Sequence, residues 1–242
     1  MRALLDGDIF AFRCASASED TDEAICIARL DKLVQDTLYM VDSSTYNVFL
    51  TGSDNFRKTL YPEYKANRKD KPKPIHLQAC REYLIKTWNA EVSEGCEADD
   101  MLGYTQTTDS VIVSIDKDLL QIPGKHYNFV KNEWFDQNEW DGIRFFYHQL
   151  LKGDRSDNIP GVAGLGEKKA QRILEGCETE QELFDTCRDL YKDDTLMYVY
   201  GACLWIWRTK GGTWQPDNLI GNSRSSYVEV ERSDSMMEKE ED

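Results

Sequence analysis

Three short apolar runs, each followed within a few residues by an acid, constrain the fold of this 242-residue chain more than any other feature. The runs cover 3–5, 47–51 and 111–115, and the acids that follow them are Asp6, Asp54 and Asp116. Runs of this length suit β-strands, and the last run is unbroken, which is typical of a strand buried on both faces of a parallel sheet. The stretch 22–41 has the periodicity of an amphipathic helix. Strands alternating with helices predict an α/β fold, a central and mostly parallel sheet flanked by helices.

The acids after these runs are expected to meet in space. Parallel strands end at the same edge of a sheet, and open α/β proteins bind ligands at that edge. Asp118 stands two residues beyond Asp116, so it can point the same way if the chain stays extended. Several carboxylates in one place suit Mg²⁺, which prefers hard oxygen ligands and keeps several waters.

A further group of acids opens a predicted helix after Gly95. It consists of Glu97, Asp99 and Asp100. Glu97 and Asp100 are three residues apart and would share a helix face. The free N–H groups and the dipole of a helix start also favour acids, so the triplet alone fits either a plain helix start or half of a metal site.

The stretch 55–86 is basic, although the chain as a whole is acidic. It holds nine Lys and Arg residues against three acids, a net of +6, with Tyr61 and Tyr64 among the cations. Such a pattern suits nucleic acid, because bases stack on aromatic rings and phosphates pair with cations. A solvated basic loop is the alternative that these residues leave open. Pro72 and Pro74 prevent one continuous helix here.

A glycine-rich turn follows an aromatic-rich span at 129–147, which is interpreted mostly as core and interdomain packing. The turn contains Gly161, Gly164 and Gly166, and glycines let the backbone approach a ligand closely. The helix expected after it carries Lys168 and Lys169, and the free N–H groups of a helix start can bind phosphate. Asp154 and Asp157 come just before this turn and add a further pair of acids.

Composition excludes several classes of protein. No apolar run approaches the ~20 residues of a membrane span, and the first residues turn acidic too soon for a signal peptide, so a cytoplasmic protein without a membrane partner is expected. Seven cysteines without a CxxC pair predict buried or free thiols rather than a disulfide frame or a zinc site. The net charge of −15 argues at first against nucleic acid, but the acids concentrate in the proposed ligands and beyond residue 226.

Six stretches, in the same order along the chain, resemble motifs of the 5′→3′ exonuclease and flap endonuclease family, and look most like its short bacteriophage members. They are 5–8, Asp54 with Arg57, 62–68, 97–100, 114–118 and 152–162. The resemblance implies a PIN-like nuclease domain and a helix–three-turn–helix module that binds DNA. It also implies two Mg²⁺ ions, for which Mn²⁺ can substitute, and a K⁺ ion at the glycine-rich hairpin.

The resemblance implies a role for each matching residue. The side nearer the first metal is expected to comprise Asp6, Asp54, Glu97, Asp99 and Asp100. The side nearer the second is expected to comprise Asp116, Asp118, Asp154 and Asp157. The catalytic cations are expected to be Lys65 and Arg68. The expected DNA contacts are Arg57, Tyr64, Gly161, Gly164, Gly166, Lys168 and Lys169.

The implied organisation is a nuclease domain at 1–140, a helical module at 141–221 and an acidic, disordered tail at 222–242. A short basic arch or clamp occupies about 55–88. Helices are expected near 179–190 and 192–209, the second with Trp205 and Trp207 in the core. Because the arch is short and broken by prolines, an exonuclease with some structure-specific endonuclease activity is favoured over a dedicated flap cutter. Expected partners are duplex DNA, 5′-flapped DNA and RNA–DNA hybrid during phage replication.

Two other functions remain as alternatives. Asp6 after a strand, with the acids at 153–157, also resembles a haloacid-dehalogenase-type phosphatase in which Asp6 is the nucleophile. That interpretation leaves the motifs at 62–68 and 97–100 unexplained. The second alternative is a non-catalytic protein that binds DNA junctions, against which the full set of acids argues.

Overall fold

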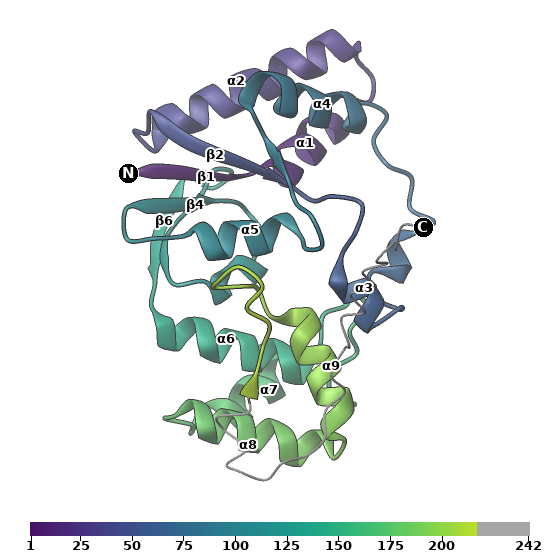
Figure 1. Ribbon diagram of the computed structural model, residues 1–242, viewed down its shortest axis with the longest axis vertical. Coiled ribbons are helices and arrows are strands. Elements are labelled where there is room, and N and C mark those ends of the chain that lie inside the picture. Colours follow the sequence, from purple (N-terminus) through teal and green to yellow (C-terminus); the bar gives the residue numbers. More distant parts are fainter. Residues whose placement is uncertain (217–242) are drawn as a thin grey trace, which may run out of the picture.

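The computed structural model describes residues 1–216 and is built around one six-stranded sheet (Figure 1). The strand order is β3-β2-β1-β4-β5-β6. The strands are β1 (Arg2–Asp6), β2 (Thr45–Leu50), β3 (Glu91–Val92), β4 (Ser110–Val113), β5 (Gly124–Asn128) and β6 (Glu133–Gln137). All neighbours pair in parallel except β5 and β6, which form an antiparallel hairpin at the edge. The predicted α/β fold with a mostly parallel sheet is therefore confirmed.

Helices cover both faces of the sheet. They are α1 (Gly7–Ser16), α2 (Glu23–Met40), α3 (Phe56–Leu60), α4 (Leu77–Trp88), α5 (Ala98–Thr105), α6 (Glu139–Lys152), α7 (Glu167–Leu174), α8 (Glu180–Tyr191) and α9 (Asp194–Leu204), with short 3-10 turns at Ala66–Arg68 and Asp118–Gln121. Figure 1 shows α1, α2 and α4 above the sheet and α5 below it. The carboxyl ends of the central strands face the side on which α3 lies.

The alternation of side chains along β1 explains why both faces are covered. Ala3 and Leu5 pack with Cys26 and Cys80, which come from α2 and α4. Leu4 points the other way and packs against Leu102 of α5. Because Ala3, Leu4 and Leu5 are all removed from water on one face or the other, this part of β1 is an unbroken apolar run.

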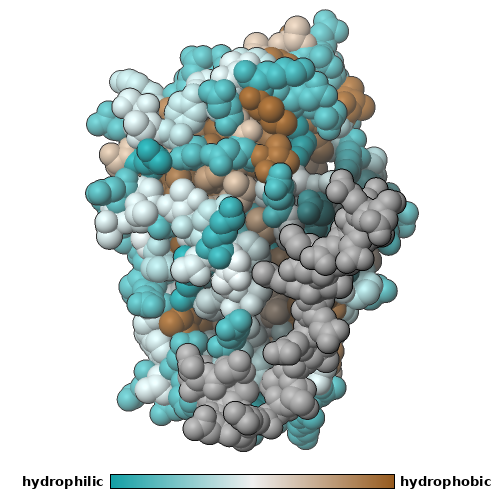
Figure 2. All heavy atoms as spheres, viewed as in Figure 1, coloured by the Kyte–Doolittle hydropathy of each residue, from teal (hydrophilic) through white to brown (hydrophobic). Residues whose placement is uncertain are grey.

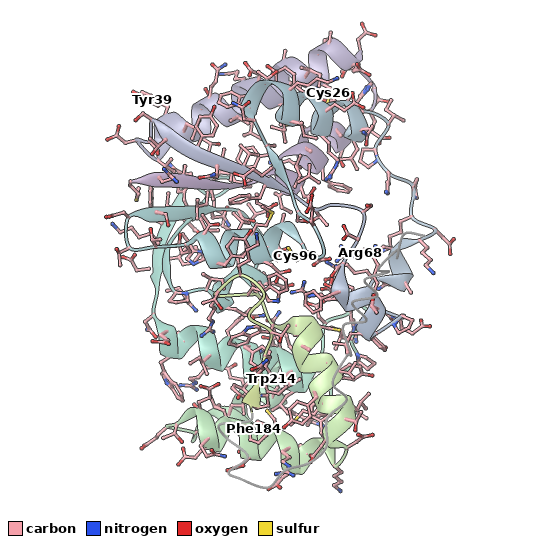
Figure 3. The ribbon with its side chains drawn as sticks, in the orientation of Figure 1. Cys26, Tyr39, Arg68, Cys96, Phe184 and Trp214 are labelled. Carbon is pink, nitrogen blue, oxygen red and sulfur yellow. The ribbon has the colours of Figure 1, made fainter. Side chains whose placement is uncertain are left out.

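The helices α6 to α9 enclose a separate apolar core. Its fully buried members include Phe146, Tyr147 and Phe184, and Trp214 lies against them after the last helix (Figure 3). Gly201 lets the Trp214 ring approach α9, since a Cβ at this glycine would stand 2.1 Å from the ring. The helical module expected after residue 140 thus has its own core, while the exact domain limits stay a prediction. The expected acidic tail at 222–242 lies outside the described residues.

Two local predictions are wrong. The helix expected to reach residue 209 ends at Leu204. The carbonyl oxygens of Cys203 and Trp205 accept hydrogen bonds from the guanidinium of Arg57, at 2.8 and 2.7 Å, where a longer helix would pair them with N–H groups four residues further along the chain. The aromatic span at 129–147 is only partly core. Trp134 and Phe135 are 45% and 38% exposed, because they lie on the edge strand β6.

The surface and the cysteines agree with the expectations from composition. All seven cysteines are free thiols, and all but Cys177 are buried. Figure 2 shows a largely hydrophilic face with hydrophobic residues in small patches. Along the part of the chain that the structure describes, no helix is both long and apolar enough to span a membrane. Trp205 and Trp207 are half-buried rather than core residues. Trp205 meets Phe146 edge to face, and Trp207 stacks on Phe56.

Candidate active site

A pocket of about 810 Å³ opens at the carboxyl edge of the sheet. Its acidic lining includes Asp6, Asp8, Glu97, Asp99, Asp116, Asp118 and Asp157. The cations that line the same pocket, here called the rim cations, are Lys58, Lys65, Arg68, Lys69 and Lys73. Acids beside cations at a strand edge form a site that can hold a divalent ion and a phosphate together.

Asp6 is placed by the junction of β1 and α1. It is 2% exposed and caps α1, with Oδ1 accepting the backbone N–H of Ile9 at 3.1 Å. Its Oδ2 accepts the hydroxyl of Ser114 at 2.6 Å. Ser114 follows the neighbouring strand β4, so this hydrogen bond ties together two strand ends that carry acids.

The acids after β4 are ordered by their own backbone. The N–H of Asp116 donates to the Ser114 hydroxyl at 3.0 Å, and the N–H of Asp118 donates to Oδ1 of Asp116 at 2.9 Å. The side chain of Gln149, from α6, donates to Oδ1 of Asp118 at 2.6 Å. These contacts turn both carboxylates toward the pocket that Asp6 lines.

The three acids at the start of α5 have two roles, which are capping the helix and lining the pocket. Glu97 and Asp100 form a capping box, in which each side chain accepts a backbone N–H of the other residue. Asp99 does not take part and lines the pocket. Glu97 also reaches the pocket, where both of its oxygens lie 2.7 Å from Nζ of Lys65.

Three of the pocket acids, Asp6, Asp99 and Asp118, have raised pKa values because they are buried near other acids. Burial, and then the nearby charge of other acids, raises the pKa of Asp6 to about 7 and that of Asp118 to about 7. The pKa of Asp99 is raised in the same way, first by burial and then by Asp116 and Asp6. Divalent cations would relieve this repulsion, so the donor set fits Mg²⁺. Within residues 1–216, no three His, Cys, Asp or Glu side chains lie close enough to hold an ion by themselves.

Metal-free protein should therefore lose stability as the pH rises from about 4 to about 7. Asp6 and Asp118 have a pKa of 3.8 in the unfolded chain and about 7 in the fold, so the folded state holds more protons across this window. Thermal melts should show a falling midpoint with chelator and a much smaller fall with Mg²⁺. Asp6→Asn combined with Asp118→Asn should flatten the chelator curve. Identical slopes with and without Mg²⁺ would contradict a cation site among these acids.

Lys65 and Arg68 lie on the rim because the segment around them is tied to the loop before the glycine hairpin. The N–H of Lys65 donates to the carbonyl of Asp157 at 2.9 Å, with Lys65 in the left-handed backbone region at φ 55°. Arg68 donates from Nη2 to Oδ1 of Asp157 at 2.7 Å. Burial would lower the pKa of Lys65, but Glu97 and Asp157 outweigh it and the pKa is raised, so this ammonium stays charged. Figure 3 shows Arg68 on the same side as α3.

Three predicted site residues are buried and held by hydrogen bonds. Arg57 is 2% exposed and donates from two nitrogens to the two oxygens of Asp100, at 2.5 and 2.7 Å, so a phosphate would compete with Asp100 for it. Asp100 is 0% exposed and does not line the pocket. Tyr64 lines the pocket but is 3% exposed, and its hydroxyl lies 2.8 Å from Asp157 and 3.0 Å from Glu97. The DNA contacts of Arg57 and Tyr64 and the metal contact of Asp100 therefore stay predictions.

Other predicted residues lie beside the pocket rather than in it. Asp54 is exposed and accepts the N–H of Gly95 at 2.8 Å, and it does not line the pocket. Asp154 lines a second pocket of about 740 Å³ at the glycine hairpin, where its Oδ1 accepts the N–H of Ser156. Their metal contacts therefore stay predictions.

The glycine hairpin has the tight geometry that its sequence suggests. Gly161 and Gly164 have φ angles of 66° and 78°, and Gly166 is the residue that caps α7. A Cβ at Gly161 would stand 2.3 Å from the N atom of Gly153, so only glycine fits there. Lys168 and Lys169 follow on the exposed first turn of α7, where their contact with DNA stays a prediction.

Sequence reasoning missed several residues that shape the site. Ser114 links Asp6 with Asp116, and its place just before Asp116 is the only signal that pointed to it. Gln149 orients Asp118 from 31 residues away along the chain, and no sequence pattern marks it. Lys58, Lys69 and Lys73 were visible as part of the basic stretch, but not as lining of the acidic pocket.

Comparison with known proteins assigns the family. The family described as 5′-3′ exonuclease, N-terminal resolvase-like domain matches residues 2–145. The chain belongs to this 5′-3′ exonuclease family. This confirms the resemblance that the six motifs indicate.

Relatives of this 5′-3′ exonuclease family member match just over half of it. DNA polymerase I of Caldicellulosiruptor bescii is 36% identical over 154 residues, which are 53% of this chain and 18% of the polymerase. Flap endonuclease Xni of Shewanella sp. (strain W3-18-1) is 31% identical over 56% of this chain and 58% of its own length. The chain thus spans less than two thirds of the length of these relatives.

Solved structures share the fold of this exonuclease family member. The T5 5′-exonuclease with bound zinc ions superposes with a TM-score of 0.69 at 19% sequence identity, covering 84% of this chain and 89% of the other. A bacteriophage T5 flap endonuclease in a complex with DNA and metal ions gives a TM-score of 0.59 at 18% identity, covering 84% and 92%. At such identities the likeness concerns the arrangement of helices and strands.

Proposed function

We propose that this protein is a two-metal, Mg²⁺-dependent 5′→3′ exonuclease that also cuts 5′ flaps. The observation that carries the proposal is the meeting of Asp6, Asp99, Asp116 and Asp118 in one pocket that Lys65 and Arg68 also line. Relatives described as a flap endonuclease, and a T5 structure described with zinc, support the activity and the metal dependence. Duplex DNA and 5′-flapped DNA are the proposed substrates, with RNA–DNA hybrid as a further one.

The proposed reaction is hydrolysis of a phosphodiester bond. Metal ions held by Asp6, Asp99, Asp116 and Asp118 would supply Lewis-acid activation of water and charge stabilisation at the leaving oxygen. The rim cations would bind the phosphate backbone, which makes binding independent of sequence and sensitive to salt. Lys65 would move from Glu97 to the scissile phosphate and stabilise its developing charge.

The segment 55–88 supports exonuclease activity over threading of a long flap. It consists of α3, a short 3-10 turn at Ala66–Arg68, a linker and α4. The 3-10 turn is fastened to the loop at 155–157, where Asn67 and Arg68 donate to the carbonyls of Arg155 and Ser156. A clamp fastened in this way cannot swing freely over the pocket to enclose a long strand. We propose that it admits a DNA end or a short flap during phage DNA replication in the host cytoplasm.

The alternatives receive less support. Both oxygens of Asp6 accept hydrogen bonds from Ile9 and Ser114, which suits a held metal ligand better than a free nucleophile of a phosphatase. The family match also favours a nuclease over a haloacid-dehalogenase phosphatase. A non-catalytic junction binder would need no crowded acids at the base of its DNA site. K⁺ at the glycine hairpin and Mn²⁺ in place of Mg²⁺ remain part of the proposal.

Cleavage of 5′-labelled DNA tests the proposal. Plain duplex and a 5′ flap are incubated with Mg²⁺ and, separately, with chelator. Labelled mono- or dinucleotides released only with Mg²⁺ would support the exonuclease, and a flap-length product would add the endonuclease. Binding of both substrates without cleavage would overturn the proposal in favour of the junction binder.

Lys65→Ala should slow the chemical step by about 100-fold, since one positioned charge at a developing anion contributes about this factor. Single-turnover rates with saturating enzyme measure the step separately from binding. Lys69→Ala is the matched control, because Lys69 lies on the same rim but makes no ion pair with the pocket acids. An unchanged single-turnover rate in Lys65→Ala would remove Lys65 from the mechanism.

A further inference from the structure

Arg81 of α4 turns toward the pocket instead of toward solvent. Its Nη1 donates to Oδ1 of Asp8, and its Nη2 donates to the carbonyl oxygen of Thr51 at 2.6 Å. The side chains of Arg81 and Asp8 are only 23% and 31% exposed. The guanidinium therefore bridges α4 to the first turn of α1 and to the residue that follows β2.

Thr51 is fixed by contacts from three elements. Its N–H donates to Oδ2 of Asp8 at 2.8 Å, and its carbonyl accepts from Arg81. Its hydroxyl oxygen accepts the N–H of Ala98 at 3.0 Å. Ala98 is the first residue of α5, and Asp99 comes next. This network thus sets the position of α1 relative to α5, the two helix starts that carry pocket acids.

Asp8 itself lines the same pocket as Asp6 and Asp116. A free carboxylate at this place would be available to a bound cation. In the structure, however, one oxygen of Asp8 accepts from Arg81 and the other accepts from Thr51. Arg81 also balances the negative charge of Asp8, so the pocket gains a carboxylate without gaining net charge.

We propose that Arg81 is a positioning residue, which withholds Asp8 from the metal ions of the nuclease site and anchors it on Thr51. The inference rests on the proposed function, because it assigns a role toward the metal ions of that site. Loss of Arg81 frees a carboxylate beside Asp6, so metal binds more tightly. The same loss detaches α4 from α1 and β2, so DNA cleavage slows. Opposite changes in metal affinity and turnover distinguish this role from plain structural support, whose loss would weaken both.

Mn²⁺ binding without DNA tests the inference directly, with free Mn²⁺ measured by electron paramagnetic resonance. Arg81→Gln should bind Mn²⁺ about tenfold more tightly. Substitution of residues that hydrogen-bond to metal ligands changes metal affinity by about this factor. Adding Asp8→Asn to Arg81→Gln should return the affinity to within about twofold of wild type. Lys58→Gln is the matched control, because it removes a rim cation that does not contact Asp8. The changes in Mn²⁺ affinity caused by Lys58→Gln and by Asp8→Asn should be additive in the double variant. Asp8→Asn should not cancel the change caused by Lys58→Gln.

Each result has a defined meaning. Unchanged or weaker Mn²⁺ binding by Arg81→Gln, or a gain that Asp8→Asn does not reverse, would overturn the inference while leaving the nuclease proposal intact. No Mn²⁺ binding by the wild-type protein would overturn both. If circular dichroism shows that Arg81→Gln is unfolded, Arg81→Lys replaces it, since lysine keeps the charge but cannot reach Asp8 and Thr51 at once. Mn²⁺ affinity of Arg81→Lys should rise about threefold, and an unchanged affinity would overturn the inference.

Discussion

Asp116→Asn should lower the rate of DNA cleavage by at least about 1,000-fold, while DNA affinity stays within about threefold of wild type. The substitution keeps the shape of the side chain but removes a charge that would hold a metal ion. Metal ions contribute several kcal/mol to such a transition state, and each 1.4 kcal/mol is about tenfold in rate. DNA affinity should hold, since it depends on the cations of the rim.

Single-turnover cleavage and an equilibrium binding assay in Ca²⁺ separate the two effects. Asp36→Asn is the matched control, because Asp36 is 59% exposed on α2, where it pairs with Lys32 of the same helix. It should cleave at the wild-type rate. Full activity in Asp116→Asn would contradict the assignment of the acids after β4 to the metal site.

Arg57→Met should destabilise the protein by about 3–5 kcal/mol, because it leaves the carboxylate of Asp100 buried without its partner. Arg57 also donates to the carbonyls of Cys203 and Trp205, so the substitution removes contacts between the sheet domain and the end of α9. Urea denaturation measures the free energy of unfolding. A loss under about 1 kcal/mol would mean that the pair is not the structural bridge that the geometry indicates.

The double variant Arg57→Met with Asp100→Leu provides the control for this prediction. It removes both charges, and buried pairs replaced by apolar side chains of similar volume often recover most of the lost stability. The pair should therefore show strong coupling in a double-mutant cycle. If the double variant is as unstable as the sum of the single variants, the loss in Arg57→Met comes from the backbone contacts instead.

The positions of the proposed metal ligands can be predicted from the sequence where the order of the strands alone decides them. Asp6 ends β1 and Asp116 follows shortly after β4, and adjacent parallel strands must end at one edge, so their meeting needs no knowledge of packing. The same reasoning does not extend to α5. Glu97 and Asp100 share a helix face, yet the capping box and Arg57 turn Asp100 inward, while Glu97 and Asp99 line the pocket.

The nucleic-acid side is harder to predict, because it depends on long-range contacts. Tyr64 stands among cations in the sequence, which is typical of a base-stacking residue. In the fold its hydroxyl donates to Asp157, a residue 93 positions away, and this removes the ring from solvent. Arg57 and Arg81 likewise belong to the basic stretch but form ion pairs with Asp100 and Asp8. A count of charges along the chain cannot distinguish such paired cations from those free to bind phosphate.

Anomalous diffraction from crystals soaked in Mn²⁺ tests the central claim most directly. Asp6, Asp99, Asp116 and Asp118 line one pocket, and a two-metal site places its ions about 4 Å apart. The account predicts two anomalous peaks among these four acids, with both peaks lost in Asp116→Asn with Asp6→Asn. No peak in this pocket, or peaks bound only elsewhere on the surface, would contradict it.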